Sequence, residues 1–436
     1  MSYKEYLKDK KIAIIGLGAH GEMVSDIKFL LKNNAQITLF ELRSEKRLKD
    51  VGNQIKQLGI EKILFEAKIN SDDLIEYDLI LLSSEISRKS LFLKKAVDSQ
   101  IQIEYPETLF FKLAPPITLV GILGEYGKTT VTYLLNSVLK KGFEEYDGEN
   151  LFLIDPDSNL GILSNLKKIK KGDLVIFKIS ENLLPHFIQM RISPHVAVIT
   201  STIDFGILEF QTYNNFIVAS NEVIDAMKSE EKFSSKAKIL RTRESLIPED
   251  WNIPKFPSYN LSNLSLVFQA SELFKIPLET VRQIFQSPVS LKGRMEFIKK
   301  VGNVDFYNDA SSITPKSTLA AINSLYSKYG DKNTILIIGG AYTGKDYSEL
   351  VQKLPDYVKG IVLISGSGVL GLREDLKNIP DIVFDLSFSV EEAVLKAKEM
   401  SKKGDRVLFS PAFEAVGIDI SRRERGEKFV KAVRSL

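Results

Sequence analysis

The segment Gly121–Thr130 combines residue types that together can bind the phosphates of a nucleotide. It reads GILGEYGKTT and lies between an apolar run, Ile117–Gly121, and a helical pattern that begins near Lys128. Glycines let backbone N–H groups turn toward an anion, and the N-terminus of the following helix adds a favourable dipole. A lysine at this place neutralises phosphate oxygens, and a threonine hydroxyl can bind Mg²⁺. We therefore expect ATP and Mg²⁺ to bind here, through Gly124, Gly127, Lys128, Thr129 and Thr130.

The spacing of this loop differs from the common phosphate-loop pattern G-x-x-x-x-G-K-[ST]. The chain instead has G-x-x-G-x-x-G-K-T-T, with Ile122 where the common pattern has its first glycine. A glycine turn followed by a solvated lysine would have a similar composition. The strand before the loop and the helix after it favour phosphate binding.

A second glycine-rich loop, Gly16–Gly21, follows the apolar run at the start of the chain. A helical pattern over Glu22–Lys32 and a strand over Gln36–Phe40 come next, which together make one βαβ unit. Such a loop binds a dinucleotide in many proteins, and Glu41 would then contact a ribose. The glycines could also serve packing alone.

Composition and charge limit the kinds of protein that this chain can be. It has 436 residues, of which 44% are hydrophobic and 26% are charged, as in globular proteins. The 59 Lys and Arg against 56 Asp and Glu give a net charge of +3, too small to attract nucleic acid or a membrane surface. Cysteine is absent, which removes disulfides and thiolate metal sites. We expect a cytoplasmic protein.

Strand and helix patterns alternate along the whole chain and predict an α/β fold with three domains. Each is expected to be a mostly parallel sheet with helices: Rossmann-like at 1–114, a phosphate-loop domain at 115–288 and Rossmann-like again at 289–436. The first boundary lies at the stiff Ala114–Pro116 linker. Further strands are predicted at Leu79–Leu82, Val196–Ile199, Gly360–Ile364 and Arg406–Phe409.

The phosphate-loop variant resembles that of the Mur ligases and the related folylpolyglutamate ligases, which join an amine to a carboxylate through an acyl phosphate. Other segments resemble, in order, the Mur ligases that add D-glutamate to UDP-N-acetylmuramoyl-L-alanine. Asp157–Gly161 is similar to their G-G-N-I-G, Gly293–Glu296 to H-R-x-E and Asn308–Asp309 to the start of N-D-S-K-A-T-N. Weaker matches are Gly339–Gly340 with Lys345 and Asp346, Ser410–Ala412, and Arg425–Phe429.

The resemblance implies a function and roles for individual residues. The chain would be a monomeric, ATP-dependent amide ligase of peptidoglycan precursor synthesis, with a UDP-sugar peptide precursor and an amino acid as substrates. The UDP-sugar would contact Gly18, His20, Glu41, Arg43 and Asn159, and the amino acid would contact Lys345 and Ser410. ATP would also contact Asn263, Arg294 and Asp309. Catalysis would depend on Lys128, Arg294 and Asp309, and Mg²⁺ would be bound by Thr129 and Glu181.

Several of these positions have ordinary alternatives. Asn159 could simply be a turn residue, and Arg294 and Lys345 could be solvated surface charges. Asp309 follows an apolar strand, Val304–Tyr307, whose carboxyl end would face a ligand crevice. The histidines, His20, His186 and His195, do not have the spacing of a metal triad.

The sequence also departs from the family at positions that matter for catalysis. Lys178 stands where a magnesium-supporting glutamate is expected, Phe205 where a histidine is expected, and Ser220 where a carbamylated lysine is expected. In the last domain, Gly293 replaces a histidine, and Ser311 and Ile313 replace a lysine and a threonine. Two hypotheses follow: a ligase that is slow or takes another substrate, and a non-catalytic relative that binds ATP and a UDP-sugar as a sensor or scaffold. A nicotinamide-dependent oxidoreductase would explain only residues 16–21.

Overall fold

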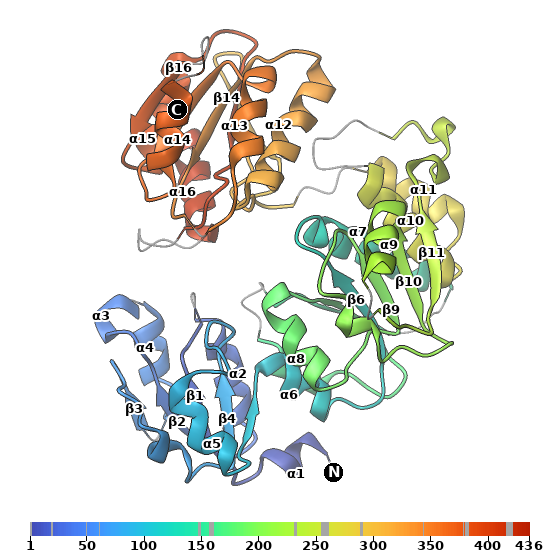
Figure 1. Ribbon diagram of the computed structural model, residues 1–436, viewed down its shortest axis with the longest axis vertical. Helices are drawn as coiled ribbons and strands as arrows, with labels where there is room; N and C mark the ends of the chain where they lie inside the picture. The colour runs from blue at the N-terminus through green and yellow to red at the C-terminus, as the bar shows by residue number, and fades with distance from the viewer. Residues whose placement is uncertain are drawn as a thin grey trace. The chain divides into compact units, whose positions relative to one another are not determined.

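The computed structural model describes residues 2–18, 21–48, 50–60, 62–146, 150–156, 161–230, 233–253, 261–287, 291–342, 344–377, 379, 383–415 and 422–436. Within these ranges the strands form three separate sheets, each accompanied by helices (Figure 1). The expected α/β class with three mostly parallel sheets is therefore confirmed.

The N-terminal sheet has the strand order β3-β2-β1-β4-β5, and all of its strand pairs are parallel. The two central strands, β1 and β4, are short apolar runs, and almost all of their side chains are buried. The elements are α1 (Tyr3–Leu7), β1 (Lys11–Ile15), α2 (Met23–Leu31), β2 (Gln36–Phe40), α3 (Glu45–Leu48), α4 (Asp50–Lys56), β3 (Lys62–Leu64), η1 (Ser71–Leu74), β4 (Leu79–Leu82), η2 (Leu91–Leu93), α5 (Lys94–Asp98), β5 (Gln102–Glu104) and α6 (Pro106–Leu113).

The central sheet has the order β11-β10-β9-β6-β8-β7 and is also parallel throughout. Strand β6, which leads into the phosphate loop, lies in the middle, between β9 and β8. The elements are β6 (Thr118–Leu123), α7 (Lys128–Tyr146), β7 (Leu151–Ile154), η3 (Leu163–Lys167), β8 (Leu174–Lys178), η4 (Glu181–Leu183), α8 (Leu184–Gln189), β9 (Val196–Ile199), η5 (Phe205–Leu208), β10 (Phe216–Ser220), α9 (Asn221–Ser229), β11 (Lys238–Thr242), η6 (Glu244–Leu246), η7 (Glu249–Trp251), α10 (Leu261–Leu273) and α11 (Leu278–Gln286).

The C-terminal sheet has the order β12-β13-β17-β14-β15-β16, and its edge pair β12–β13 is antiparallel. The two strands are joined by Gly302 and Asn303, both at positive φ (56° and 63°), as a tight hairpin turn requires. The elements are β12 (Glu296–Val301), β13 (Val304–Asn308), α12 (Pro315–Tyr329), β14 (Thr334–Gly339), α13 (Ser348–Tyr357), β15 (Gly360–Ile364), α14 (Val369–Lys377), β16 (Val383–Ser387), α15 (Val390–Met400), β17 (Arg406–Phe409) and α16 (Arg422–Ser435).

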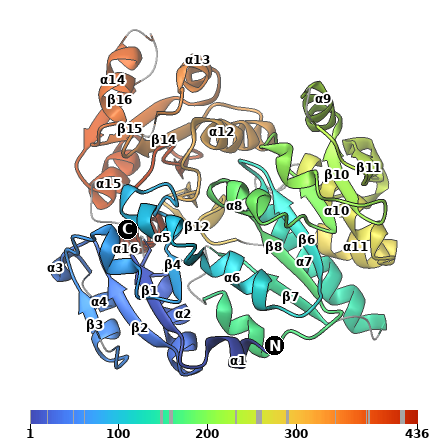
Figure 2. The same ribbon diagram turned by 60° about the horizontal axis from the view of Figure 1, so that its bottom comes forward.

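Contacts divide the chain into two units, the first formed by 1–247 with 265–282 and the second by 248–264 with 283–436. Within the first unit, one hydrophobic core runs through both the N-terminal and the central sheet. Helix α6 lies beside α8 in both views (Figures 1 and 2), and its Phe111 packs on Phe177 of β8 and Phe187 of α8, at ring distances of 5.0 and 5.4 Å. The domain boundaries at 114 and 288 stay a prediction. None of the helices in the described ranges is long and apolar enough to cross a membrane.

Candidate functional site

The phosphate loop has the strand–loop–helix context that the sequence predicts. It leaves the carboxyl end of β6 and enters α7 at Lys128. Gly124 and Gly127 have φ angles of +133° and +82°, which side chains rarely allow. Lys128 Nζ bends back over the loop and donates to the carbonyl oxygens of Gly124 and Glu125, the latter at 3.2 Å. These carbonyls hold the ammonium where phosphate oxygens could replace them.

Two hydroxyl residues that the sequence reasoning missed, directly after the neighbouring strand β9, support this loop. Ser201 Oγ accepts a hydrogen bond from the backbone N–H of Glu125 at 2.6 Å. Thr200 Oγ1 lies 2.9 Å from the carbonyl oxygen of Leu123. A Cβ added to Gly124 would come within 2.1 Å of Thr200 Oγ1, so this glycine cannot be replaced without moving the support. The signal in the sequence was a pair of hydroxyl residues directly after an apolar strand.

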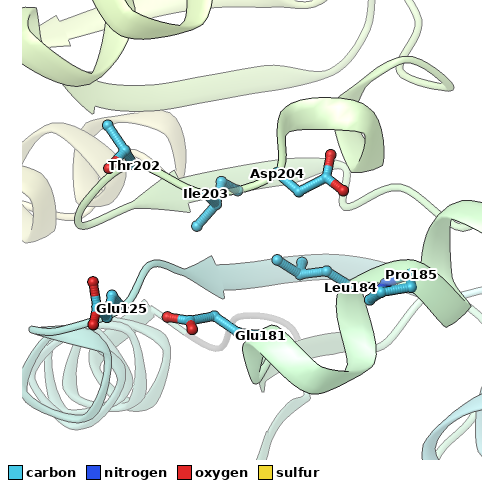
Figure 3. Close-up of a pocket in the computed structure, with 7 residues that line it drawn as sticks. All are labelled: Glu125, Glu181, Leu184, Pro185, Thr202, Ile203 and Asp204. Carbon is cyan, nitrogen blue, oxygen red and sulfur yellow. The ribbon is translucent and has the colours of Figure 1, made fainter. Parts of the chain in front are cut away.

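An acidic pocket of about 280 Å³ opens beside the loop. It lies at the carboxyl ends of β6, β8 and β9, where ligands of parallel sheets bind. Its polar lining comes from Glu125, Glu181, Thr202 and Asp204, together with apolar Leu184, Pro185 and Ile203 (Figure 3). The Glu181 side chain extends toward Glu125, whereas Asp204 points away from both and accepts the N–H of Gly206 at 3.0 Å. In the described ranges, no three acidic, His or Cys side chains converge as a ready metal site.

Lys178, for which the sequence resemblance led us to expect a glutamate, has an acidic partner. It is the last residue of β8, and its Nζ lies 2.5 Å from Oδ1 of Asp155, the residue after β7. Both side chains are buried. The positive charge of Lys178 is therefore balanced by Asp155 and is not left unpaired beside the pocket.

Phe205 and Ser220, where the resemblance led us to expect a histidine and a lysine, have local structural roles. Phe205 is buried in the core and packs edge-on against Phe233, with ring centroids 6.3 Å apart. Ser220 ends β10 and caps helix α9, because its side chain accepts a hydrogen bond from the N–H of Val223 at 3.4 Å. Each of these two residues thus stabilises the fold locally.

The glycine loop after β1 is held closed by Glu41, at the end of β2. Glu41 is buried, and its carboxylate accepts the N–H of Leu17 at 3.0 Å and the N–H of Arg43 at 2.8 Å. Arg43 also donates from Nε to Glu41 at 2.9 Å and from Nη2 to the carbonyl of Gly18 at 2.8 Å. The hydrogen bond to Glu41 raises the pKa of Arg43. Because this carboxylate is used inside the loop, the geometry does not favour ribose recognition by Glu41. His20 lies outside the described residues.

Ser83 is a second residue that sequence reasoning missed. It follows β4, and its Oγ is buried with no hydrogen-bond partner in the part of the chain that the structure describes. A Cβ on Gly16 would lie 2.6 Å from this oxygen, so the hydroxyl sits against the glycine loop. Strands β1 and β4 are neighbours at the centre of the sheet, where strand order reverses and ligands of open α/β sheets bind.

In the second unit, the structure brings Arg294, Asp309 and Ser410 together. Asp309 is buried at the end of β13 and accepts hydrogen bonds from Ser410 Oγ at 2.8 Å and from the N–H of Met295 at 3.2 Å. Burial raises the pKa of Asp309 to about 6, while hydrogen bonds from Ser312 and Ser410 and the charge of Arg294 act in the opposite direction.

Gly293 and Ser311 contact each other in this unit. Gly293 has φ +68°, its carbonyl accepts the N–H of Ser311 at 3.0 Å, and a Cβ there would lie 3.2 Å from Ser311 Oγ. Glu296 lies beside them: its Oε2 accepts hydrogen bonds from the N–H of Gly293 at 2.9 Å and from Asn308 Nδ2 at 3.1 Å. Ile313 is half-buried after this turn.

The other predicted site residues are placed as follows. Lys345 is exposed in the loop between β14 and α13. Asn263 is half-buried in the first turn of α10. Arg425 is buried and structural, since it donates to the carbonyls of Gly339 at 3.2 Å and Phe413 at 3.0 Å. Asn159 lies outside the described residues.

Comparison with known sequences connects these features. Residues 293–413 match the family described as Mur ligase, glutamate ligase domain. The chain is also 26% identical over 473 aligned residues to UDP-N-acetylmuramoylalanine--D-glutamate ligase of Clostridium kluyveri, covering 100% of this chain and 98% of that relative. The same protein of Clostridium botulinum strain Okra is 26% identical, with the same coverage.

Solved structures support the same fold. The murein peptide ligase of Psychrobacter arcticus superposes with a TM-score of 0.56 at 16% identity, covering 98% of this chain and 99% of that one. UDP-N-acetylmuramate-alanine ligase of Thermotoga maritima also gives 0.56, at 15% identity and the same coverage. The Yersinia pestis folylpolyglutamate synthase/dihydrofolate synthase, solved with AMPPNP and Mn, gives 0.51 at 15% identity over 74% of this chain and 90% of that one. The chain therefore has the three-domain Mur ligase fold, is homologous to ligases along its whole length, and carries a Mur ligase glutamate ligase domain at residues 293–413.

Proposed function

We propose that this chain is an ATP-dependent amide ligase of peptidoglycan precursor synthesis that adds D-glutamate to UDP-N-acetylmuramoyl-L-alanine. The observation that carries the proposal is the homology to such a ligase over the whole chain, combined with a phosphate loop in its working strand–loop–helix context. In the proposed reaction, the substrate carboxylate takes the γ-phosphoryl group of ATP and releases ADP. The amine of D-glutamate then attacks the acyl phosphate, loses a proton and displaces inorganic phosphate.

Phosphoryl transfer depends mainly on positioning and on neutralising charge. In this chain, Lys128 would leave the carbonyls of Gly124 and Glu125 and donate to the phosphates. Glycine backbone N–H groups and the N-terminus of α7 would supply further donors. Thr200 and Ser201 would keep the loop in the required shape, because they bond its backbone and not the ligand.

Magnesium would be held beside the same loop. Mg²⁺ is usually bound by one or two carboxylates with the phosphates and water completing the shell, so three converging carboxylates are not needed. Thr129 and Glu181 would hold it, with Asp204 on the opposite wall of the pocket. The ion would neutralise charge on the transferred phosphoryl group. The oxygen-rich lining of this pocket fits such an ion.

The second unit would bind the adenine nucleotide and the incoming amino acid. Arg294 and Asp309 would contact ATP, and Ser410 and Lys345 would contact the amino acid. This proposal is supported by the buried carboxylate of Asp309, which accepts a hydrogen bond from Ser410 and interacts with the charge of Arg294. Since its pKa is about 6, Asp309 is ionised at neutral pH and can orient the Arg294 guanidinium.

A non-catalytic role, as a sensor or scaffold that binds ATP and a UDP-sugar, is the second candidate. It is favoured by the way the departing residues are built into the fold: Lys178 is paired with Asp155, Phe205 is in the core and Ser220 caps a helix. These residues stabilise the structure at positions where the family has catalytic groups. Slow turnover, or a different amino acid, would be an intermediate outcome.

One assay separates these possibilities. ADP release is measured with ATP, Mg²⁺, UDP-N-acetylmuramoyl-L-alanine and a panel of amino acids that includes both enantiomers of glutamate, and the product is identified by mass spectrometry. Lys128→Ala protein is the control for contaminating enzymes. ADP release that depends on D-glutamate and yields the amide supports the ligase. ATP binding without ADP release for any amino acid would overturn it and favour the non-catalytic role.

A further inference from the structure

Thr318 is a fully buried threonine of helix α12 that contacts Ser410, the residue that donates a hydrogen bond to Asp309. Its Oγ1 lies 2.9 Å from Ser410 Oγ and 3.3 Å from the carbonyl oxygen of Ser410. Ser410 Oγ lies in turn 2.8 Å from Oδ2 of Asp309. The three side chains, which come from α12 and from the ends of β17 and β13, therefore form a continuous row of oxygen atoms inside the second unit.

The directions of these hydrogen bonds follow from the number of protons in the row. A hydroxyl group has one proton to donate, and an ionised carboxylate can only accept. Since the proton of Ser410 goes to Oδ2 of Asp309, the proton between the two hydroxyls comes from Thr318. A hydroxyl that accepts a hydrogen bond becomes a stronger donor. The row therefore acts as a relay that runs from Thr318 through Ser410 to Asp309.

We propose that Thr318 is a positioning residue that holds the Ser410 hydroxyl as a donor to Asp309, and so fixes this carboxylate for nucleotide binding by the second unit. The role of Asp309 in nucleotide binding rests on the proposed function. The relay of hydrogen bonds does not depend on it.

The backbone on both sides of the relay is already fixed by the sheet. The N–H of Asp309 donates to the carbonyl of Phe409 at 2.8 Å, and the N–H of Ser410 donates to the carbonyl of Ile337 at 3.1 Å. The freedom that remains is rotation of the Ser410 side chain, which can take several staggered rotamers. Thr318 selects one of them, because its proton is offered to Ser410 Oγ at that position.

Helix α12 holds Thr318 in a defined place. The helix begins with Thr314 as its N-cap, which forms a capping box with Ser317, and Pro315 is its first residue. The N–H of Thr318 donates to the carbonyl of Thr314 at 3.1 Å. A threonine inside a helix can bond its own preceding turn, whereas Thr318 Oγ1 contacts Ser410. The start of the helix thus positions the hydroxyl toward the end of β17.

The carboxylate at the end of the relay is held on both oxygens. Besides the bond from Ser410 to Oδ2, its Oδ1 accepts the N–H of Met295 at 3.2 Å, and the side chain of Ser312 also donates to it. The carbonyl of Ser312 accepts the N–H of Ala412 at 2.9 Å, and Ala412 has φ +60°, which residues other than glycine rarely adopt. Such a conformation persists where its surroundings fix it, as they do beside the relay.

The charge that acts on this carboxylate comes from Arg294. Burial raises the pKa of Asp309 to about 6, and the hydrogen bonds to the carboxylate and the charge of Arg294 oppose this rise. Glu296 accepts hydrogen bonds from neighbouring N–H groups, Arg425 of α16 donates to backbone carbonyls, and Lys316 of α12 is exposed. A weaker donor in the relay should therefore raise the pKa of Asp309 further.

The first test needs no ligand and uses the full chain labelled with ¹³C at the aspartate carboxyl carbons. The signal of Asp309, identified by its loss in Asp309→Asn, is followed over a pH series. Thr318→Val removes the hydroxyl and should raise the pKa of Asp309, whereas Thr318→Ser keeps the hydroxyl and should leave it near the wild-type value. Thr334→Val, at a buried threonine that begins β14, is the matched control. Thr318→Ala is a second variant without the hydroxyl if Thr318→Val does not fold.

A double variant shows whether Thr318 acts through Ser410. Ser410→Ala removes the direct donor and should raise the pKa of Asp309 by itself. Adding Thr318→Val to Ser410→Ala should then cause no further rise. An unchanged pKa in Thr318→Val, or a further rise in the double variant, would overturn the relay.

The second readout is calorimetric binding of ATP with Mg²⁺. Thr318→Val should weaken binding by about two- to tenfold, the factor that one hydrogen bond of this kind contributes, and Thr318→Ser and Thr334→Val should not. A raised pKa of Asp309 with unchanged ATP affinity would overturn the positioning role. If wild type does not bind ATP, the proposed function fails together with the nucleotide role of Asp309, while the carboxyl titration still decides the relay.

Discussion

Lys178 and Asp155 form a buried ion pair at the carboxyl end of the central sheet, with Nζ and Oδ1 2.5 Å apart and side chains only 4% and 7% exposed. Lys178 is the register partner of Ile122, so both side chains leave the same face of the sheet, just before the phosphate loop. The pair therefore lies beside the strand that leads into the loop. A change to either residue should therefore lower the stability of the fold, whatever its effect on catalysis.

Replacing Lys178 by glutamate should destabilise the protein. Lys178→Glu would bury two carboxylates side by side, and breaking a buried pair typically costs about 3–5 kcal/mol. We expect a large fall in the urea midpoint of the first unit. The charge-reversed pair Lys178→Glu with Asp155→Lys should recover part of the loss, and the exposed Lys168→Glu should change stability by less than about 0.5 kcal/mol. Wild-type stability of Lys178→Glu would show that the ion pair does not form.

Nucleotide binding should depend on Lys128. Lys128→Ala removes the cation that the loop holds over its own carbonyls. Since charge-assisted hydrogen bonds contribute about 1.5–3 kcal/mol each, calorimetry should show ATP–Mg²⁺ binding weakened by about a hundredfold. Lys140→Ala, on the exposed side of the same helix, is the control. Equal affinity of the Lys128 variant and wild type would remove the ATP assignment.

Reverting Ser220 and Phe205 should also reduce stability. Ser220→Lys removes the N-cap of α9, at about 1 kcal/mol or less because the bond is long at 3.4 Å. Phe205→His places a polar ring in the core, at about 1–3 kcal/mol if it finds no partner. Thermal unfolding should show both losses, and Ser229→Lys at the other end of α9 should be neutral. A revertant without either loss would show that these residues are not structural.

The phosphate loop and most strands could be predicted because their signals are local. The bounds of β2, β4, β9, β15 and β17 agree with the sequence, since each is a short apolar run between polar residues. The edge strands β3, β7, β11, β12 and β16, and β10 beside β11, were not predicted. In β12, the run EFIKKV has only an irregular apolar pattern, because an edge position needs no continuous apolar stretch.

The site residues that the sequence reasoning missed, Asp155 and Ser201, were missed for a different reason from the strands. Asp155 meets Lys178 only because β7 lies beside β8, and Ser201 meets Glu125 only because β9 lies beside β6. Strand order is a non-local property that spacing along the chain does not reveal. The sequence was therefore enough to place Lys178 at the end of a strand, but only the structure could identify Asp155 as its partner.

The N-terminal sheet should bind a uracil nucleotide and not a nicotinamide dinucleotide. In dinucleotide-binding loops the acidic residue after the second strand bonds the ribose, whereas Glu41 bonds the backbone of its own loop and Arg43, so its part in a UDP-sugar site would be to hold the loop. Fluorescence titration with NADH and with UDP-sugars tests this, and tighter binding of NADH would revive the dehydrogenase hypothesis. Ser83→Ala, which removes a buried hydroxyl beside Gly16, should weaken UDP-sugar binding by severalfold, and the exposed Ser84→Ala should not.

The stability of the first unit should depend on pH through Asp26. Its pKa is raised from 3.8 to about 7 in the folded protein, so between these values the folded state holds a proton that the unfolded state has lost. The contribution to stability is therefore fully present below pH 3.8 and is lost as pH rises through about 7. The loss proceeds at up to about 1.4 kcal/mol per pH unit.

Asp26→Asn removes this titration, so its stability relative to wild type should rise with pH up to about 7 and then level off. Asp309, whose pKa is raised to about 6, acts in the same direction but is present in both proteins, so it cancels in the difference. Differential scanning calorimetry over a pH series measures the two melting temperatures and separates the transitions of the two units. Parallel curves for Asp26→Asn and wild type across this range would show that Asp26 titrates normally. The bonds from Ile162 and Leu163 would then offset the full cost of burying the carboxylate.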